Sequence, residues 1–434
     1  MTHQAAQLMT HRQIDFHGWN AYEIRNDLVR LVAVPDIGGR IMAYDLGPYA
    51  FLYVDRALAG QLFSAEENQG DGSLAAWKNY GGDKTWPAPQ GWDHEDQWAG
   101  PPDCILDTGR YHLDSINSNV KEATIQMTSP PGSPTGIQIT RQATIRAHSS
   151  RVTLDLSFRN ISQRNLRWSI WDVVQLNAER LTPDGQLAPQ TECVVTAPLN
   201  PSSKFNEGYY VMFGDPQNPQ WQVAREAGLF LGNYQWEIGK VGLDSRGGWA
   251  AFANKEASTA FAARYTPQTD GDYPDDGAAV EFWTVGRGKV ANLDYEQSKI
   301  YLMELEILSP FQKIEPEQAV SFQIEWGSCI CPGPIIDVTE GGCVSKNLNA
   351  KSEPPYTQLI GTFGVFDLGQ LKIDWLDTLG NLLSTHDLGP VSPLGVVTLD
   401  HVIEGPPLAT QVQLVVTDSN QKAYILHSAR IDHT

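Results

Sequence analysis

Alternation of apolar and polar residues, with almost no helical pattern, is the feature that most constrains the fold of this chain. Residues 136–148 (GIQITRQATIRAH) and 151–162 (RVTLDLSFRNIS) alternate with a period of two and are joined by two serines, which predicts a hairpin. Residues 167–176 (RWSIWDVVQL) follow after a short polar turn, and similar runs continue to residue 326. Many short strands without intervening helices predict an all-β fold, built as a large antiparallel supersandwich.

The domain organisation follows from breaks in this pattern. Residues 1–14 are assigned to an N-terminal tail, and residues 15–332 to the large sandwich domain, which ends where Pro and Gly gather. A polar linker is predicted over residues 333–352. Alternating runs resume after it, so residues 353–434 are expected to form a small C-terminal β-sandwich.

Composition narrows the possible ligands. The 434 residues include 31 Lys and Arg against 51 Asp and Glu, so the formal net charge is −20. This charge repels nucleic-acid phosphates and anionic lipids, and neither is expected as a partner. The 13 tryptophans instead favour a neutral ligand such as a sugar or oligosaccharide. Because no apolar run has the length of a signal peptide or a membrane span, the protein is expected to be cytoplasmic.

Two segments were considered as metal sites. Residues 270–277 (DGDYPDDG) carry several aspartates but lack the spacing of a calcium loop, so a solvated turn is favoured. The odd number of cysteines does not fit a disulfide framework, and their spacing lacks the four ligands that zinc prefers. The sequence therefore predicts ordinary thiols and neither a metal nor a cofactor. The cysteines are Cys104, Cys193, Cys329, Cys331 and Cys343.

Residues 79–98 (NYGGDKTWPAPQGWDHEDQW) combine aromatic and ionic side chains without the period of a helix or a strand, which indicates a loop. Trp86 and Trp92 offer flat faces for a pyranose ring, and nearby polar groups offer hydrogen bonds to its hydroxyls. The alternative is a structural loop whose tryptophans close one end of the sandwich. The polar candidates in this stretch are Asn79, Asp83 and Lys84.

Residues 301–308 (YLMELEIL) predict a strand with two different faces. Glu304 and Glu306 share one face with two leucines, while the other face is apolar. Carboxylates two residues apart on a strand lie about 6–7 Å from each other, a spacing suited to binding sugar hydroxyls. The alternative is a solvated strand face without a function.

Three motifs, in this order along the chain, resemble the galactose mutarotase-like superfamily, which includes the aldose 1-epimerases. They are residues 28–47 (LVRLVAVPDIGGRIMAYDLG), 79–89 (NYGGDKTWPAP) and 301–326 (YLMELEILSPFQKIEPEQAVSFQIEW). Within the superfamily, residues 81–90 and 273–284 most resemble a bacterial family of unknown function, DUF4380. The resemblance covers roughly residues 20–330 and leaves the C-terminal region unassigned.

The resemblance implies a general base on the strand that carries Glu304 and Glu306, and an arginine, Arg40, near the sugar ring. Tyr80 and the strand with Gln175 lie where mutarotases carry histidines, so two of the expected catalytic groups are missing. The candidate catalytic residues are Glu304, Glu306, Tyr80 and Asp83, and the candidate substrate-binding residues are Arg40, Asn79, Lys84, Trp86, Trp92, Trp171, Gln175, Tyr273 and Glu281.

Three functions remain open on these residues. The first is a carbohydrate-binding protein whose catalysis, if any, is a sugar epimerisation or isomerisation. The second is a glycoside-cleaving enzyme that pairs a glutamate of the 301–308 strand with Asp83 or Asp172. The third is a non-enzymatic interaction protein that docks through its C-terminal domain. Without a histidine acid, mutarotation of free glucose or galactose is expected to be weak or absent.

Overall fold

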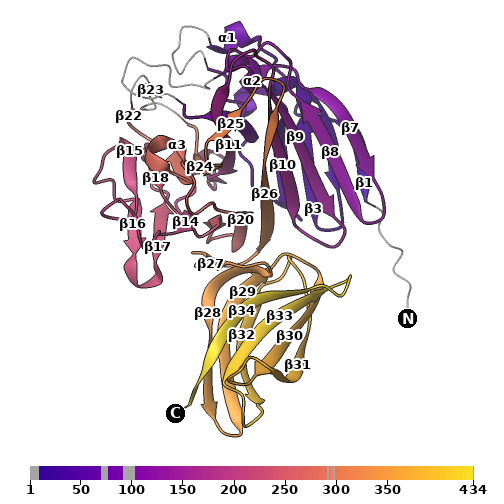
Figure 1. Cartoon of the computed structure of the whole chain (residues 1–434), viewed down its shortest axis with the longest axis vertical. Helices are drawn as coiled ribbons and strands as arrows, with labels where there is room; N and C mark the ends of the chain where they lie inside the picture. Colours follow the sequence, from indigo (N-terminus) through magenta and orange to yellow (C-terminus); the bar gives the residue numbers. More distant parts are fainter. Residues whose placement is uncertain are drawn as a thin grey trace.

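The predicted all-β class is confirmed, because two large antiparallel sheets make up most of the chain (Figure 1). The computed structural model describes residues 9–69, 77–90, 103–290, 293–294, 296 and 299–433. Within these stretches, no helix is long and apolar enough to span a membrane.

The 12-stranded sheet brings strands from distant parts of the chain side by side. Two short strands join its main path, β5 (Tyr49–Ala50) beside β4 and β25 (Gln312–Ile314) beside β11. In spatial order the main path is β1 (Thr10–Phe16), β2 (Trp19–Arg25), β3 (Val29–Val34), β4 (Arg40–Leu46), β6 (Asp83–Ala88), β11 (Leu166–Asn177), β24 (Leu302–Leu308), β21 (Val280–Thr284), β18 (Gly239–Leu243) and β15 (Tyr210–Gly214).

The 10-stranded sheet contains the hairpin that the alternating sequence predicts. Its two strands, β9 and β10, pair in register with Ile145 opposite Val152, as expected for the runs joined by two serines. In spatial order this sheet is β16 (Trp221–Ala224), β17 (Leu229–Asn233), β14 (Cys193–Pro198), β19 (Trp249–Asn254), β20 (Thr259–Tyr265), β26 (Ala319–Ile330), β10 (Val152–Asn160), β9 (Ile137–Arg146), β8 (Glu122–Thr128) and β7 (His112–Ser118).

The main apolar core lies between these two sheets, and β24 shows how the sequence builds it. Met303, Leu305 and Ile307 point inward and are fully buried in the core. Burial of such side chains contributes roughly 1.5–3 kcal/mol each, so an orientation of the strand that exposes them is strongly disfavoured. Glu304 and Glu306 therefore point to the outer face, as the alternation predicts.

Helices and short ribbons connect the strands. In α2, the side chain of Asp103 caps the N-terminus by accepting from the backbone N–H of Ile105 and Leu106, at 3.0 and 3.1 Å. The short elements are α1 (Ala65–Gln69), α2 (Cys104–Thr108), α3 (Pro274–Gly277), the 3₁₀ turns η1 (Pro35–Ile37), η2 (Arg56–Leu58) and η3 (Arg225–Ala227), and the ribbons β12 (Glu179–Leu181) with β13 (Leu187–Pro189) and β22 (Lys289–Val290) with β23 (Leu293–Asp294).

The C-terminal strands form an eight-stranded sheet that encloses its own apolar core and lies at one end of the molecule in Figure 1. All its pairings are antiparallel except that of β28 with β34. The strands are β27 (Asp337–Val338), β28 (Gly342–Glu353), β29 (Tyr356–Val365), β30 (Gly369–Leu376), β31 (Leu382–Val391), β32 (Val397–Glu404), β33 (Gln411–Asp418) and β34 (Ala423–His433).

Two boundaries differ from the predicted ones. Residues 342–352 of the predicted linker belong to β28, because alternate residues of this polar stretch are buried against the C-terminal core. Residues 10–14, placed in a tail, belong to β1, which pairs along its whole length with β2. Polar composition misled both predictions, since a strand with one exposed face needs only every second residue to be apolar.

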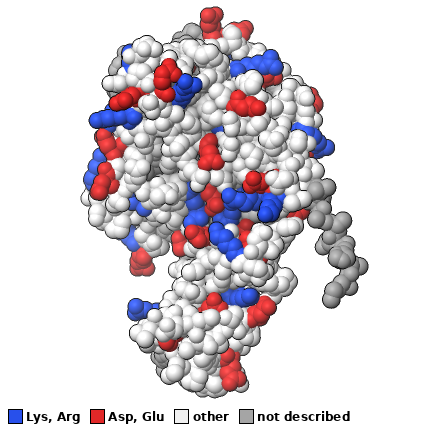
Figure 2. All heavy atoms as spheres, turned by 45° about the vertical axis from the view of Figure 1, so that its right-hand side comes forward, with Lys and Arg blue, Asp and Glu red and all other residues white. Residues whose placement is uncertain are grey.

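The large sandwich and the C-terminal sheet share contacts. The guanidinium of Arg151 pairs with Asp367 at 3.0 Å and with Glu325 at 2.6 Å, so one buried cation joins the two parts. The backbone N–H of Ser150 also donates to the carbonyl of Phe366 at 2.8 Å. In Figure 2, side chains of both signs gather where the two parts meet. An apolar cluster spans the same junction and contains Ala260, Ala262, Cys329, Cys331, Val338, Cys343 and Phe366 among others.

Candidate functional site

The stretch that the sequence indicates as a loop contains a central strand. Residues 83–88 form β6, which pairs antiparallel with β11 so that Trp86 lies opposite Trp171. The strand was missed because both of its faces carry polar side chains, and no apolar alternation is visible. Trp92, the other tryptophan proposed to stack on a sugar, lies outside the described residues.

The outer face of the 12-stranded sheet brings several predicted residues together. Gln175 of β11 lies opposite Glu304 of β24, and Glu306 of β24 lies opposite Glu281 of β21. Directly opposed side chains on neighbouring strands lie about 4.5–5.5 Å apart at Cβ. The predicted residues that share this face are Lys84, Trp86, Trp171, Gln175, Glu281, Glu304 and Glu306.

One group on this face is the Lys84 cluster, made of Lys84, Trp86, Gln175 and Glu304. Lys84 Nζ lies 3.2 Å from Glu304 Oε1 and 4.5 Å from the ring centre of Trp86. Gln175 Nε2 donates to the same Glu304 oxygen at 2.5 Å. Burial lowers the pKa of Lys84, although the carboxylate of Glu304 opposes this effect. The Glu304 side chain keeps 12% of its surface exposed, whereas Lys84, Trp86 and Gln175 are buried.

The second group is the Lys240 cluster, made of Lys240, Trp171, Glu281 and Glu306. Lys240 Nζ lies 2.7 Å from Glu281 Oε2 and 3.0 Å from Glu306 Oε2, and 4.6 Å from the ring centre of Trp171. Trp171 Nε1 donates to Glu306 Oε2 at 2.8 Å. Both carboxyl groups are fully buried. The sequence analysis missed Lys240, although a lysine within an otherwise apolar strand is a signal for a buried charge with partners.

The pKa shifts in the Lys240 cluster follow from burial and from the number of charged groups in it. Burial disfavours the charge of Lys240, but the two carboxylates outweigh this effect and raise its pKa. Burial raises the pKa of Glu281 well above its usual range and also raises that of Glu306, with Lys240 opposing both shifts. One cation therefore faces two buried acids. The charge of Glu306 raises the pKa of Glu281, and that of Glu304 raises the pKa of Glu306.

Asp107 of α2 holds the indole of Trp86 in place from the side. Asp107 Oδ1 accepts from Trp86 Nε1 at 3.2 Å and from the guanidinium of Arg40, and its Oδ2 accepts from Asn68 and Trp77 at 2.8 and 3.3 Å. Arg40 thus reaches the Lys84 cluster through Asp107 rather than by touching it. No pattern in the sequence identifies Asp107, because its four donors come from separate parts of the chain.

Asp83, a predicted catalytic residue, lies on the opposite face of β6. Its carboxylate pairs with Arg141 of β9, between the two sheets, and Arg141 also donates to the backbone carbonyl of Gly39 at 2.7 Å. Burial raises the pKa of Asp83, which Arg141 opposes, and raises that of neighbouring Asp172 further. Asp83 and Asp172 therefore tie the two sheets together, and the structure does not bring them to Glu304 and Glu306.

Three further candidates also lie away from the carboxylates. Tyr80 is buried with Trp19 in a separate apolar cluster, and burial raises its pKa to about 12. Tyr273 accepts a hydrogen bond from the backbone of Gln268 at 3.0 Å. Asn79 is half-buried beside Tyr80. None of these three makes a contact with Glu304 or Glu306 among the side-chain interactions of the described residues.

The sequence family matches the one that the motifs resemble. Residues 20–328, more than half of the chain, match the family described as Domain of unknown function (DUF4380). The chain belongs to the DUF4380 family. No curated protein matches it in sequence.

Solved structures similar to this DUF4380 protein share little of its sequence. A galactose mutarotase-like protein from Clostridium acetobutylicum has 10% identity and a TM-score of 0.44, covering 74% of this chain and 98% of that one. One from Lactobacillus casei has 9% identity and a TM-score of 0.41, covering 71% and 99%. A TPR-domain containing protein from Parabacteroides distasonis has 10% identity and a TM-score of 0.46, covering 73% and 48%.

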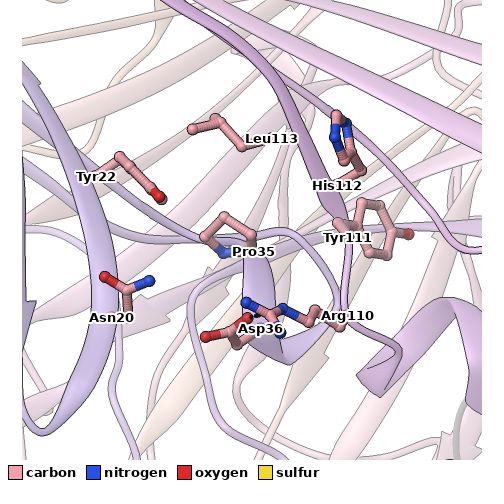
Figure 3. Close-up of a pocket in the computed structure, with 8 residues that line it drawn as sticks. All are labelled: Asn20, Tyr22, Pro35, Asp36, Arg110, Tyr111, His112 and Leu113. Atoms are coloured by element: carbon pink, nitrogen blue, oxygen red, sulfur yellow. Dashed lines mark ion pairs between the residues drawn. The ribbon is translucent and has the colours of Figure 1, made fainter.

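The structure of this DUF4380 protein also has hollows away from the two lysine clusters. Figure 3 shows one of about 280 Å³ between β2, η1 and the segment leading into β7, where Arg110 pairs with Asp36 at 2.7 Å. A second, of about 260 Å³, lies near Arg30, Asp45 and Asn177. Arg30 is already paired with Glu23 and Asp45 there, so its charge is satisfied within the protein.

Among the residues that the structure describes, no group of three or more His, Cys, Asp or Glu side chains is arranged to hold a metal ion. The thiols of Cys329, Cys331 and Cys343 lie in the apolar cluster at the junction with the C-terminal sheet. Burial raises the pKa of Cys329 and of Cys343, so these thiols stay protonated.

Proposed function

We propose that this protein binds a sugar on the outer face of β6, β11, β24, β21 and β18, and that its chemistry is the interconversion of sugar forms. The observation that carries this proposal is the meeting of the two lysine clusters on one sheet face. The rings of Trp86 and Trp171 lie 5.5 Å apart in an edge-to-face arrangement and so connect the two clusters.

The chemistry of this face suits a neutral ring with many hydroxyl groups. Indole faces attract the C–H surface of a pyranose, while carboxylates, ammonium groups and an amide bind its hydroxyls. The charges of the Lys84 cluster are balanced, which favours a neutral ligand over an anion. Glu304 is the most exposed carboxylate of the face, so a ligand arriving from the exterior meets it first.

Calorimetric titration of the protein with a panel of free monosaccharides and oligosaccharides tests binding. We expect at least one member to bind, and Trp86→Ala to weaken that binding about tenfold, since an indole contributes about 1–2 kcal/mol to a stacked ring. Glu304→Gln, which preserves shape, is expected to weaken it as well. Binding to no member of the panel would contradict the proposal.

Trp168→Ala is the matched control. Trp168 is a half-buried tryptophan of the same strand as Trp171, but its indole donates to the backbone carbonyl of Thr135, at 3.3 Å, and packs against the main core. We expect its replacement to lower stability without changing sugar affinity. Equal losses of affinity in Trp86→Ala and Trp168→Ala would show that the effect is general and that the site lies elsewhere.

A further inference from the structure

We infer that Glu281 and Glu306 share one proton at neutral pH and that this carboxyl pair is the acid that the missing histidines would otherwise supply. The two side chains lie directly opposite each other on β21 and β24, are both fully buried, and contact one ammonium group, that of Lys240. The use of this proton in catalysis rests on the proposed function, whereas its presence does not.

The charge balance requires a proton. Two ionised carboxylates beside one ammonium group leave a net charge of −1 in a fully buried place, and an uncompensated buried charge costs several kcal/mol. Binding one proton removes that charge, as in other carboxyl pairs that share a site. The proton belongs to the pair, because strongly coupled groups titrate together.

Among the residues that the structure describes, the groups around the pair do not provide a second cation. Facing the pair are Lys240 from β18, Glu304 from β24 and Asp275 from α3, and Lys84 on β6 is already paired with Glu304. Two of these three nearest charges are negative. The raised pKa values of Glu281 and Glu306 agree with this count.

Hydrogen bonding leaves a place for the proton. Glu306 Oε2 accepts from both Trp171 and Lys240, and Lys240 also lies against Glu281 Oε2. The two Oε1 atoms are buried and have no hydrogen-bond partner among the described residues. A proton on one of them turns an unsatisfied acceptor into a donor, which is the form that an acid catalyst needs.

The reaction balances with these groups alone. The carboxylate of Glu304 takes the proton of the anomeric hydroxyl, the C1–O1 bond becomes a carbonyl, and the bond from C1 to the ring oxygen breaks. The electron pair of that bond goes to the ring oxygen, which takes the proton held by the Glu281–Glu306 pair. Ring closure on the other face of the carbonyl reverses each transfer and restores both groups.

Infrared spectroscopy of the full-length protein at pH 7 tests the shared proton directly, by the carbonyl band of a protonated carboxyl group. The buried Asp83–Asp172 pair can contribute to the same band, so the measurement is the difference spectrum between the wild type and each variant. We expect Glu281→Gln and Glu306→Gln each to lose one component of the band, because the remaining acid then pairs with Lys240 alone. Glu304→Gln is the matched control and should keep the band. Absence of the band from the wild type, or difference spectra of both variants without a lost component, would overturn the inference.

Polarimetry tests the catalytic use of the proton. With the sugar that binds best, we expect Glu306→Gln to slow mutarotation at least about 100-fold while its affinity changes only a few-fold, as for loss of a general acid. A band without any sugar binding would refute the proposed function and leave the shared proton intact. A band with unchanged mutarotation in Glu306→Gln would refute the assignment of the acid.

Discussion

The Lys84 and Lys240 clusters each pair a buried lysine with an indole, yet the pKa of the lysine is shifted in opposite directions in the two clusters. Each has an ammonium group near an indole face, at 4.5 and 4.6 Å, and each has a carboxylate partner. The pKa of Lys84 is lowered by burial and that of Lys240 is raised, against the effect of burial, by its carboxylates. The number of carboxylates explains the difference, since Lys84 has one and Lys240 has two.

The pKa of a buried lysine on a sheet therefore depends on the charged groups around it. Arg40, paired with Asp107, adds a positive charge that further disfavours the ammonium form of Lys84. Glu281 adds a negative charge that favours the ammonium form of Lys240. The ammonium form of the lysine is therefore disfavoured in the first cluster and favoured in the second.

The largest effect is expected for Lys240→Met, which leaves two buried carboxyl groups without a cation. We expect a loss of about 3–5 kcal/mol in the free energy of unfolding at neutral pH. Glu281 and Glu306 then have folded-state pKa values further above their unfolded values, so the folded state binds more protons and stability falls as pH rises through the acid range. Denaturant unfolding at pH 5 and pH 8 checks this, with the larger loss at pH 8. Equal losses at both values would contradict it.

Lys84→Met should cost less, about 2 kcal/mol, because Glu304 keeps the hydrogen bond from Gln175 and part of its surface is exposed. In the wild type the lowered pKa of Lys84 means that the unfolded state binds more protons in the alkaline range, so stability rises there with pH. The variant should lose this slope. Unfolding curves between pH 8 and pH 10.5 measure it, and an unchanged slope would show that Lys84 is not the group responsible.

Replacement of either indole should lower stability by less than replacement of either lysine. Trp171→Phe removes one of the two donors to Glu306 among the described residues and is expected to cost about 1–2 kcal/mol. Trp86→Phe removes one of the four donors that the described part of the chain provides to Asp107, and it should cost less than about 1 kcal/mol. Thermal unfolding of both variants side by side is the measurement. A reversed order would mean that ring packing, rather than hydrogen bonding, decides their contributions.

The smallest effect is expected for Gln175→Met. The amide nitrogen of Gln175 donates to Glu304, but its oxygen is buried and without a hydrogen-bond partner among the described residues. Loss of the bond is thus offset by removal of an unsatisfied acceptor, and the net cost should stay below about 1 kcal/mol. Chemical unfolding at pH 7 checks this, and a loss as large as that of Lys84→Met would show that the amide is the main partner of Glu304.

The sequence predicts the features of this site that lie within one strand. It does not predict the contacts that depend on which strands are neighbours in the sheet. The all-β class, the family and the two faces of the 301–308 strand follow from alternation and motifs, and the structure and family match confirm them. The position of Asp83 away from Glu304 and Glu306 could not be predicted, because β6 carries polar groups on both faces and Asp83 pairs with Arg141 in the other sheet.

Lys240 and Asp107 could not be predicted for a different reason. Lys240 meets Glu281 and Glu306 only because β18, β21 and β24 are neighbours, an order that the sequence does not reveal. Asp107 gathers donors from β4, β6, α1 and the segment with Trp77. The catalytic roles of the predicted residues remain predictions.

The apolar cluster at the junction between the large sandwich and the C-terminal sheet affects how the protein unfolds. The family match ends at residue 328, within β26, whereas the cluster continues through Cys343 to Phe366 of the C-terminal sheet. The segment that matches the family is thus shorter than the segment that apolar packing holds together. Heating should melt both parts in a single cooperative event, and a protease should find no intact fragment to release at that boundary.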